Sequence, residues 1–490
     1  MAINESTVWE IRTTGNQANG GGFADLDPGT SVDYSQQDSA QLALTDCKHP
    51  AGSATLTSET GGFTAAMVGN VLRVVSGTNF YSDWYQITAY VSGNEITVDS
   101  SLGWSANTTG DGVVNVGGAF LLGGNLDYDW PKALVKGNTV YIQAGTYSVE
   151  NTMDLATTPY ETSPINFYGY KVARGDNPTG TDRPLIAMGD WYFDAGGVTN
   201  FSHLRFTGSS IYIIECAGTF FNVLATNTSS SSNYMALSLN GSGSIVSCEI
   251  TAPRCIGVKF NSTGNVINCY IHDCYTALDI DYATCNVEGC VIETAQLALD
   301  MSGSWKDEII ISHNTIVGCL TGIYATTGAS NKVFNNIFAN NYEGVKWTNA
   351  SYMSFFDYNC WSNNLTDIVG STATKGGNDV TADALLGSDV VTGTDGATDA
   401  DGTVFTAASN PFGSVTTSDY VNIVEAGTGA TLGVYNIASV DGAGQITLGR
   451  SAGASKTGIG YRIVVGTDFT LQASSPCFNA GLRLDTYIGL

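Results

Sequence analysis

The sequence predicts an all-β protein: a right-handed parallel β-helix, or solenoid, that carries two duplicated small β-barrel or sandwich modules. Three observations predict this fold class. The chain has 58 Gly among 490 residues and only 13% charged residues, a composition unlike that of helical proteins. A pattern of 21 to 24 residues occurs five times in succession between about 246 and 347. A longer stretch occurs twice, at 71–103 and at 421–453.

Each copy of the short pattern contains two short apolar strands. The first strands read SCEIT, NCYIH, GCVIE, HNTIV and NNIFA, and they begin at Ser247, Asn268, Gly289, His313 and Asn335. The second strands read IGVKF, TALDI, LALDM, TGIYA and EGVKW. The period is too short for a pair of helices and lacks helical spacing, so it is typical of the coils of a parallel β-helix.

Equivalent residues of successive coils should stack in columns, because neighbouring coils lie about 4.8 Å apart. One column holds thiols and then amides that could form a ladder at a bend: Cys248, Cys269, Cys290, Asn314 and Asn336. The next inward column is Ile250, Ile271, Ile292, Ile316 and Phe338, and the opposite wall contributes Val258, Leu278, Leu299, Ile323 and Val345. Such a solenoid needs covered ends, so caps are expected elsewhere in the chain.

Taken in order, the chain divides into five expected segments. Gly-rich turns predict an N-terminal cap over 1–50, and alternating strands predict a first β module over 51–118. The parallel β-helix is expected over 119–387, and its long turn Lys171–Asp194 is expected to project from it. A second, inserted β module should occupy 388–467, and a closing segment of the β-helix should occupy 468–490.

The two modules are predicted to be copies of one fold. The stretches at 71–103 and 421–453 align without a gap, and upstream the segment FTAA occurs at both Phe63 and Phe405. Gly-Asn and Gly-Ala-Gly turns between alternating strands predict hairpins in both copies. The residues that should be equivalent include Tyr85 with Tyr435 and Ile96 with Ile446.

The second module interrupts two segments that belong together, NDVTADALLG at 378–387 and DFTLQASSPCFNAG at 468–481. Joined, they resemble the closing signature of the pectate-lyase-like right-handed β-helix superfamily, over about 119–387 and 468–490. The opening WEIRTTGNQANGGGF, with the small modules, resembles phage-encoded β-helix spike and decoration proteins. This resemblance implies a fold but no single activity, since the architecture carries lyases, hydrolases, epimerases and passive spikes.

Charge and targeting signals narrow the partners. The formal net charge of −26 opposes binding to nucleic acid and to anionic membranes, and the few basic residues are scattered. The N-terminus lacks a signal-peptide pattern, and no apolar run of 18 residues suggests a membrane span. The eleven cysteines are expected to be buried thiols, because several occupy inward β positions.

The candidate catalytic residues form an outward column on adjacent coils. Asp279 and Asp300 occupy equivalent positions, Lys259 lies one coil earlier, and Asp281 follows two positions along. Stacked carboxylates could serve a glycoside hydrolase, or a lyase with Lys259 or Arg254 as base. The three aspartates could instead hold Ca²⁺, and no other cofactor is expected. The alternative is a Lys-Asp ladder on a solvated face.

Other side chains suggest binding rather than chemistry. Candidate carbohydrate-binding residues, which could stack on sugar rings or simply pack against turns, are Trp191, Tyr192, Trp305 and Trp347. His272 and Glu293 share an outward column beside Asp273, where an imidazole next to a carboxylate could perform acid–base work.

Two functions are compatible with these features. The first is a virion-associated structural protein, a phage spike, tail or head-decoration component with a host-surface glycan as ligand. It would be made in the host cytoplasm and located in the virion, with other virion proteins as partners. The alternative is a polysaccharide lyase or glycoside hydrolase. A homotrimer is expected because an outward column is apolar or β-branched: Tyr270, Val291, Thr315 and Ile337.

Overall fold

The computed structural model forms two compact units, 1–226 and 227–490. It describes residues 3–103, 108, 110–124, 126–155, 163–280, 284–303, 308–326, 331–347, 353–370, 374–382, 389–417, 419–431 and 433–464. The expected closing segment, 468–490, lies outside these residues. In the described ranges the helices are α1 (Trp130–Ala133) and 3-10 turns at Ala65–Met67, Gly180–Asp182 and Pro411–Ser414. None of these is long and apolar enough to cross a membrane.

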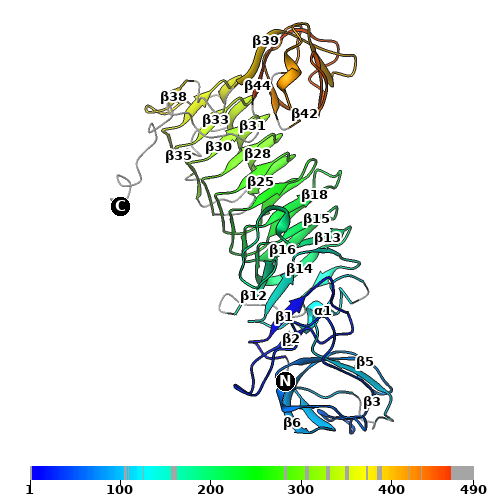
Figure 1. Ribbon diagram of the computed structural model, residues 1–490. Helices are drawn as coiled ribbons and strands as arrows, with labels where there is room; N and C mark the ends of the chain where they lie inside the picture. The colour runs from blue at the N-terminus through cyan, green and yellow to red at the C-terminus, as the bar shows by residue number, and fades with distance from the viewer. Residues whose placement is uncertain are drawn as a thin grey trace. The chain divides into compact units, whose positions relative to one another are not determined.

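Parallel coils form most of both units (Figure 1). Each coil contributes strands to three walls, which we call the first, second and third wall in the order in which the chain meets them. In unit 1 the first wall contains β9 (Thr139–Gln143), β12 (Ile165–Tyr170) and β17 (Thr219–Phe221); the second contains β10 (Thr146–Ser148), β13 (Leu185–Gly189), β15 (Arg205–Gly208) and β18 (Leu224–Asn227); and the third contains β11 (Met153–Asp154) and β16 (Tyr212–Ala217). The long strand β14 (Phe193–Ser202) runs from the third wall into the first.

Unit 2 has the same three walls. Its first wall contains β20 (Gly243–Val246), β23 (Gly264–Ile267), β26 (Cys285–Glu288), β29 (Ile309–Ser312), β32 (Asn331–Phe334) and β35 (Met353–Asp357). Its second wall contains β21 (Glu249–Thr251), β24 (Tyr270–His272), β27 (Val291–Glu293), β30 (Thr315–Val317), β33 (Ile337–Ala339), β36 (Cys360–Ser362) and β38 (Val380–Thr381). Its third wall contains β19 (Met235–Leu239), β22 (Ile256–Phe260), β25 (Thr276–Ile280), β28 (Leu297–Met301), β31 (Thr321–Ala325), β34 (Glu343–Trp347) and β37 (Thr366–Val369).

The register of these walls confirms the predicted columns. On the second wall Ile250, Ile271, Ile292, Ile316 and Phe338 are successive Cα partners, and all are fully buried. On the third wall the same holds for Val258, Leu278, Leu299, Ile323 and Val345. A one-residue slip would turn every such side chain to the other face of its wall. The alternation of apolar residues therefore fixes the register.

The corner before the second wall requires a left-handed backbone. Six residues at this corner have φ between 52° and 66°: Ser247, Asn268, Gly289, His313, Asn335 and Tyr358. Gly and Asn adopt this conformation at the lowest cost, which explains their frequency here. Inside the corner the predicted ladder forms, because the Nδ2 atom of Asn314 donates to Oδ1 of Asn336 at 3.0 Å and that of Asn336 donates to Oδ1 of Asn359 at 3.1 Å.

Cysteines extend the same inner column toward the N-terminus. Cys248, Cys269 and Cys290 are free and buried, as predicted. The expectation of thiols throughout is wrong at Cys360, which is disulfide-bonded. A thiol in an apolar interior acts as a small hydrophobic side chain, so the column joins core packing at one end to an amide ladder at the other.

The N-terminal segment of unit 1 adds β1 (Val8–Ile11), which pairs with β9 in parallel and with β2 (Gly22–Phe23) in an antiparallel arrangement. Inside, the ring of Trp130 stacks on Phe120 at 5.2 Å and meets Trp9 edge-on at 6.0 Å. All three side chains are fully buried. Large aromatic rings therefore fill the interior of the first coil.

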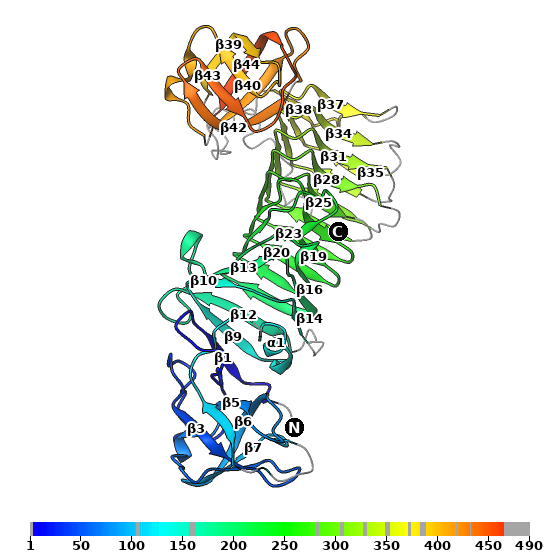
Figure 2. The ribbon, with the colours of Figure 1, turned by 90° about the vertical axis from the view of Figure 1, so that its right-hand side faces the viewer.

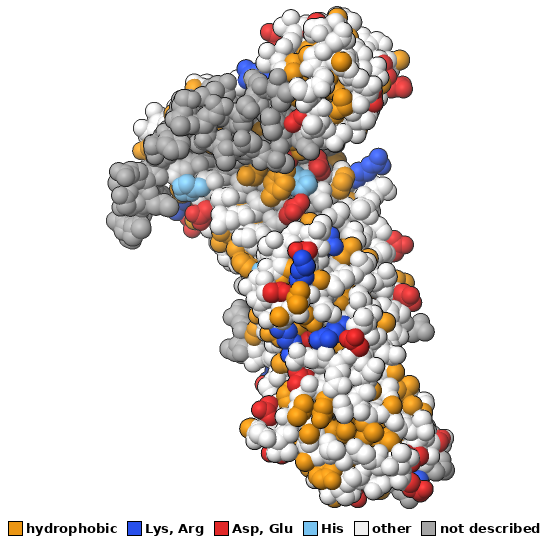
Figure 3. Space-filling view, viewed as in Figure 1, with side chains coloured by type: hydrophobic (Ala, Val, Ile, Leu, Met, Phe, Trp, Pro, Cys, Tyr) orange, Lys and Arg blue, Asp and Glu red, His pale blue; other side chains and the backbone are white. Residues whose placement is uncertain are grey.

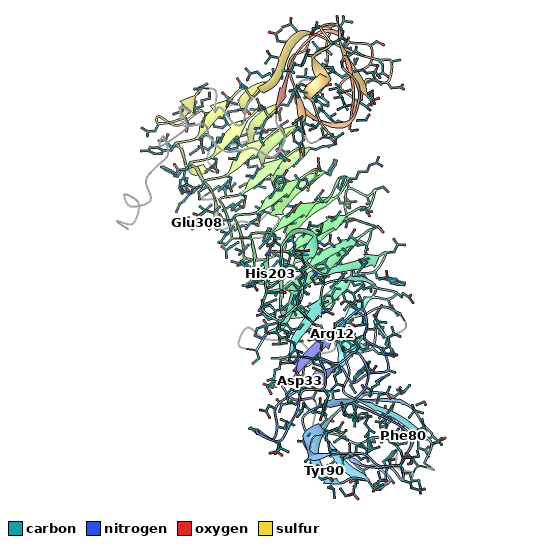
Figure 4. The ribbon with its side chains drawn as sticks, viewed as in Figure 1. Arg12, Asp33, Phe80, Tyr90, His203 and Glu308 are labelled. Carbon is teal, nitrogen blue, oxygen red and sulfur yellow. The ribbon has the colours of Figure 1, made fainter. Side chains whose placement is uncertain are left out.

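The stretch Lys171–Asp194 projects only in part, which corrects the expectation that all of it does: most of 171–182 is exposed, whereas the later residues join the solenoid. Part of it is the wall strand β13, and Arg174 lies 2.6 Å from the carboxylate of the fully buried Glu10. Glu10 also bonds to Arg12 at 2.9 Å and to the hydroxyl of Tyr170. Figure 4 labels Arg12 in this region. A buried carboxylate is costly unless it is paired, so these cations hold the turn against the solenoid.

Each unit also carries a small six-stranded antiparallel module, and we call the two modules the first and the second barrel. The second is a closed barrel, whereas in the first the edge of the sheet is joined by the isolated bridge between Lys48 and Thr57. The first contains β3 (Leu42–Cys47), β4 (Thr55–Thr57), β5 (Val71–Ser76), β6 (Trp84–Ser92), β7 (Glu95–Val98) and β8 (Gly112–Val116). The second contains β39 (Asp389–Thr398), β40 (Val404–Ala407), β41 (Tyr420–Glu425), β42 (Gly433–Gly442), β43 (Gln445–Leu448) and β44 (Thr457–Val464) (Figure 2). The order β3-β8-β5-β6-β7-β4 matches β39-β44-β41-β42-β43-β40 strand for strand. Strand β3 lies before residue 51, the expected start of the first module.

One tyrosine makes the same hydrogen bond in both barrels. The hydroxyl of Tyr85 donates to the carbonyl oxygen of Tyr81 at 3.2 Å, and that of Tyr435 donates to the carbonyl oxygen of Thr431 at 2.7 Å. Both rings are buried. Tyr85 and Tyr435 therefore occupy equivalent positions.

The gapless alignment of the copies is wrong by one residue in the preceding strand. Leu72 pairs with Tyr85, whereas Val421 pairs with Tyr435. Val421 is therefore equivalent to Leu72 and not to Val71. The loop after this strand is one residue longer in the second copy, and loops tolerate such changes.

The match between the FTAA segments is also wrong. Phe405 is the Cα partner of Ile446, as Leu56 is of Ile96. Phe405 is therefore equivalent to Leu56 and not to Phe63. Short identical strings can fall in different strands when the surrounding loops differ in length.

Candidate functional site

Two predicted carbohydrate-binding aromatics lie beside stacked carboxylates in unit 1. Trp191 precedes β14 and is 41% exposed, and Tyr192 follows it. In β14 the side chain of Phe193 is buried inside the coil, which leaves Asp194 outward and half-buried. Asp194 is the Cα partner of Asp154 on the preceding strand and of Glu215 on the next.

A third aromatic side chain joins this cluster from β16. The rings of Tyr192 and Tyr212 meet edge-on at 4.8 Å. Burial and a hydrogen bond to Glu215 raise the pKa of Tyr212 above its usual value, and Asp194 adds to the shift. The phenol therefore stays neutral and donates to the carboxylate. We call Trp191, Tyr192, Asp194, Tyr212 and Glu215 the aromatic–carboxylate cluster.

This cluster has the chemistry of a sugar-binding surface. Exposed aromatic rings stack on the apolar faces of sugars, and carboxylates accept hydrogen bonds from sugar hydroxyls. Carboxylates on adjacent coils lie roughly 5 Å apart, a separation also used by retaining glycosidases. Sequence reasoning found Trp191 and Tyr192 but missed Asp194, Tyr212 and Glu215, because it assigned 171–194 to a projecting turn. The alternation of apolar residues in Leu185–Gly189 was the available signal.

The predicted catalytic column lies on the third wall of unit 2. Lys259, Asp279 and Asp300 are successive Cα partners, as expected. The Nζ atom of Lys259 lies 3.0 Å from Oδ2 of Asp279, which is only 8% exposed. Asp300 accepts a hydrogen bond from the backbone N–H of Ser302 at 2.9 Å. This geometry fits the ladder that was the alternative to a catalytic role, since a cation already pairs with one carboxylate.

Asp281, the fourth residue of the predicted set, lies outside the described residues. Within the described ranges there is no group of three or more His, Cys, Asp or Glu side chains arranged to hold a metal ion. Of the three aspartates expected as Ca²⁺ ligands, the structure places two, Asp279 and Asp300, on adjacent coils.

The predicted pair His272 and Glu293 belongs to a buried polar cluster on the second wall. They are Cα partners on adjacent coils. Glu293 is 2% exposed and accepts hydrogen bonds from the hydroxyls of Tyr270 and Tyr420, the latter at 2.9 Å. Burial raises the pKa of Glu293. Tyr420 belongs to the second barrel, so this carboxylate joins the barrel to the wall.

His272 lies between two carboxylates. Its Nδ1 atom is 3.0 Å from Asp273 and its Nε2 atom is 3.7 Å from Glu249. Its ring also stacks on Tyr270 at 4.4 Å. Burial lowers the pKa of His272, but the hydrogen bond to Asp273 and the nearby carboxylate of Glu249 outweigh it and raise the pKa to about 9. The imidazole is thus positively charged at neutral pH, which suits a structural ion pair better than a general base.

Of the other two predicted sugar-binding aromatics, the structure describes Trp347, which does not lie on an open surface. Trp347 is 3% exposed and packs edge-on against Phe356 at 4.6 Å. Its ring fills the interior of the solenoid and is inaccessible to a sugar. Trp305 lies outside the described residues.

Basic side chains form no broad patch on the face shown in Figure 3, where Lys and Arg are few and interspersed with Asp and Glu. Most basic side chains in the described residues have acidic partners, such as Lys171 with Asp182 at 2.9 Å. This distribution agrees with the expectation from the net charge of −26.

The walls, corners and inward columns define a parallel β-helix. A family model described as the right handed beta helix region matches residues 192–333 and 255–383. These ranges contain the coils of β14 to β38. The chain therefore contains a right-handed β-helix region, as the sequence predicted.

Solved structures that match the chain include polysaccharide-degrading enzymes and a phage tailspike protein. The catalytic domain of a GH87 alpha-1,3-glucanase in complex with nigerose is 11% identical, with a TM-score of 0.29, over 70% of this chain and 98% of that one. A PL6 family alginate lyase, AlyGC, is 10% identical, with a TM-score of 0.28, over 54% and 52% of the two chains. The tailspike protein gp49 from Pseudomonas phage LKA1 is 12% identical, with a TM-score of 0.22, over 87% and 82%. No curated protein matches the chain.

Proposed function

We propose that this protein is a virion-associated structural component, a phage spike, tail or head-decoration protein, whose β-helix binds a host-surface glycan. The observation that carries the glycan-binding part is the aromatic–carboxylate cluster. It presents an exposed indole beside two further aromatic rings and two carboxylates on adjacent coils. Wall strands hold Asp194, Tyr212 and Glu215, and Trp191 and Tyr192 directly precede β14, which limits the ordering entropy lost on binding.

The chemistry of the cluster favours a neutral or basic polysaccharide. Asp154, Asp194 and Glu215 are three acidic residues in one outward column. An anionic polymer would be repelled by this column and by the net charge of −26. Sugar hydroxyls, in contrast, can donate to each carboxylate.

The virion assignment rests on the opening sequence and on the two barrels that accompany the solenoid. In such an assembly the protein would form a homotrimer, with other virion proteins as further partners. The outward column proposed for the trimer contact is half-buried at Tyr270, Val291, Thr315 and Ile337. Part of it is occupied within the chain, because the hydroxyls of Tyr270 and Tyr420 share Glu293.

Binding of the full chain to a panel of purified bacterial surface polysaccharides, measured by biolayer interferometry, tests the glycan-binding proposal. Trp191→Ala should weaken the interaction by about tenfold or more, because stacking is lost. Tyr275→Ala is a matched control, since both aromatic side chains are 41% exposed. Equal binding by the Trp191→Ala variant and the wild type would refute a role for this cluster.

A depolymerase is the second candidate, favoured by the in-register pair Asp194 and Glu215. One carboxyl group would protonate the leaving oxygen while the other attacks the anomeric carbon and breaks the glycosidic bond. Water, deprotonated by the first group, would then hydrolyse the resulting glycosyl ester and restore both carboxyl groups. Size-exclusion chromatography of the polysaccharide after incubation distinguishes the two functions. Shorter chains that disappear with Glu215→Gln would establish hydrolysis, whereas unchanged chains together with tight binding would support the structural role.

A further inference from the structure

The two barrels share their strand order but differ in the residues at one pair of neighbouring positions. Gly393 and Tyr461 are Cα partners in the second barrel, where Leu44 and Val114 are partners in the first. Next to them, Glu425 pairs with Gly460, where Ser76 pairs with Val113. The second copy therefore has two glycines where the first has branched apolar side chains.

An open pocket of about 360 Å³ lies at this place in the second barrel. Its lining includes Thr392, Gly393, Glu425, Gly460 and Arg462. A Cβ atom on Gly460 would lie 2.7 Å from Cβ of Glu425, so the side chain of Glu425 crosses the position that a larger residue would fill. Because Gly393 and Gly460 carry no side chains, the ring of Tyr461 and the side chain of Glu425 pack over them and line the pocket.

The equivalent face of the first barrel is already occupied. Asn115 takes the place of Arg462, and its side-chain amide donates to the carbonyl oxygen of Ala18 at 3.0 Å. The N-terminal segment thus covers this face in the first copy. The second copy replaces the amide with a guanidinium group that lines the pocket.

We propose that this pocket in the second barrel binds one neutral sugar residue of a glycan. The volume is within the range of small-ligand sites. The guanidinium of Arg462 donates, the carboxylate of Glu425 accepts, and the hydroxyl of Thr392 does both, which matches vicinal sugar hydroxyls. Opposite charges in one pocket offset each other and favour a neutral ligand over an ion.

The ligand class rests on the proposed glycan-binding function, whereas the site rests on the barrel alone. Saturation-transfer difference NMR of the full chain with glucose, galactose, mannose, N-acetylglucosamine and rhamnose tests the site. The double variant Gly460→Val with Glu425→Ser installs the first barrel's residues, and in the Trp191→Ala background, where only the barrel can bind, it should abolish the signal. Arg462 is half-exposed, so Arg462→Asn spares the barrel core. This substitution should weaken sugar binding by about tenfold, since a charge-assisted hydrogen bond is lost.

Two controls make each outcome decisive. The reciprocal change in the first barrel, Val113→Gly with Ser76→Glu, should leave the signal unchanged. Trp191→Ala removes the solenoid cluster while keeping the barrel. A signal that survives both barrel variants but is lost with Trp191→Ala would overturn the barrel site and leave the proposed function standing. A signal that no variant removes would overturn the barrel site as well, and the absence of any signal from the wild type would overturn both proposals.

Discussion

At the scale of single residues, the buried polar cluster around Glu293 combines two opposing charge preferences. Burial disfavours the Glu293 carboxylate and raises its pKa, whereas neighbouring carboxylates favour the imidazolium of His272 and raise its pKa to about 9. Two tyrosine hydroxyls from different elements donate to Glu293. The cluster is thus a polar joint between the second wall and the second barrel.

His272 should make the stability of the protein depend on pH. Its pKa is about 9 in the folded state and near 6.5 in the unfolded chain. Its contribution is therefore complete below about pH 6.5 and is lost as the pH rises through about 9. We expect the thermal midpoint of the wild type to fall over this interval more steeply than that of His272→Gln. Parallel curves would contradict the assignment, and the more exposed His313→Gln serves as control.

Two substitutions of Glu293 separate the contribution of its hydrogen bonds from that of its charge. Both phenols donate to Oε1, which Glu293→Gln retains as an amide oxygen, whereas Glu293→Ala leaves two phenols without their acceptor. We expect Glu293→Ala to lower the unfolding free energy by about 1–3 kcal/mol for each lost acceptor. The wild type should lose stability relative to Glu293→Gln as the pH rises above the ordinary value of 4.5, because its folded pKa is raised. Chemical denaturation at pH 4 and pH 7 measures both effects. Equal stability of the Ala and Gln variants would refute the claim that the two hydrogen bonds to Glu293 stabilise the protein.

At the scale of elements, the two barrels fill one position of their cores in two ways. A Cβ atom on Gly393 would lie 2.4 Å from the hydroxyl oxygen of Tyr461, so the tyrosine ring occupies the space that Leu44 fills in the first barrel. Leu44 with Val114 and Gly393 with Tyr461 are therefore alternative packings of the same framework. Cores tolerate such exchanges when total volume is kept.

This exchange predicts strong coupling between two substitutions. Gly393→Leu alone should destabilise the second barrel by about 1–3 kcal/mol through overpacking, and Tyr461→Val alone should leave a cavity. The double variant recreates the first barrel's pair and should recover most of the loss, with a coupling energy of about 0.5–3 kcal/mol. Urea unfolding of the wild type, the two single variants and the double variant gives the coupling energy. Additive effects of the two substitutions would contradict the proposed equivalence of the two packings.

Regular elements were predictable because their side chains alternate, and irregular ones were not. The columns through Ile271 and Leu278 follow from the alternation of inward and outward side chains. A shift of one residue would turn each inward side chain outward. In contrast, the equivalence of Val421 with Leu72 depends on a loop whose length the strand pattern does not fix. Sequence position also gave no sign that Tyr420 would meet Glu293, since 127 residues separate them.

The sequence likewise predicted some residues of the candidate site and not others. Trp191 and Tyr192 were predictable because large aromatics near turns are conspicuous in a sequence. Asp194 and Glu215 were not, because the stretch between coils is longer here and their pairing becomes visible only in the register of the third wall. Carboxylate columns can be read from a sequence only where the coil length is constant.

At the scale of the whole molecule, the homotrimer can be tested directly. Mass photometry of the wild type should give a mass near three times 51.4 kDa. Val291→Asp with Ile337→Asp should dissociate the trimer without unfolding the coils, because outward substitutions leave the inner columns intact. Asn265→Asp on the first wall is the matched control and should remain trimeric. A wild-type monomer would exclude the trimeric assembly.

The asparagine ladder also has a mechanical consequence. Backbone hydrogen bonds between parallel coils run along the solenoid axis, so an axial pull loads the coil-to-coil interfaces in series and the weakest one separates first. Coils joined by Asn314, Asn336 and Asn359 share side-chain bonds in addition to those of the backbone. Coils joined through Cys248 and Cys269 have thiols at the same position. Under tension we therefore expect unit 2 to part in its cysteine section, while the amide section stays intact as a block.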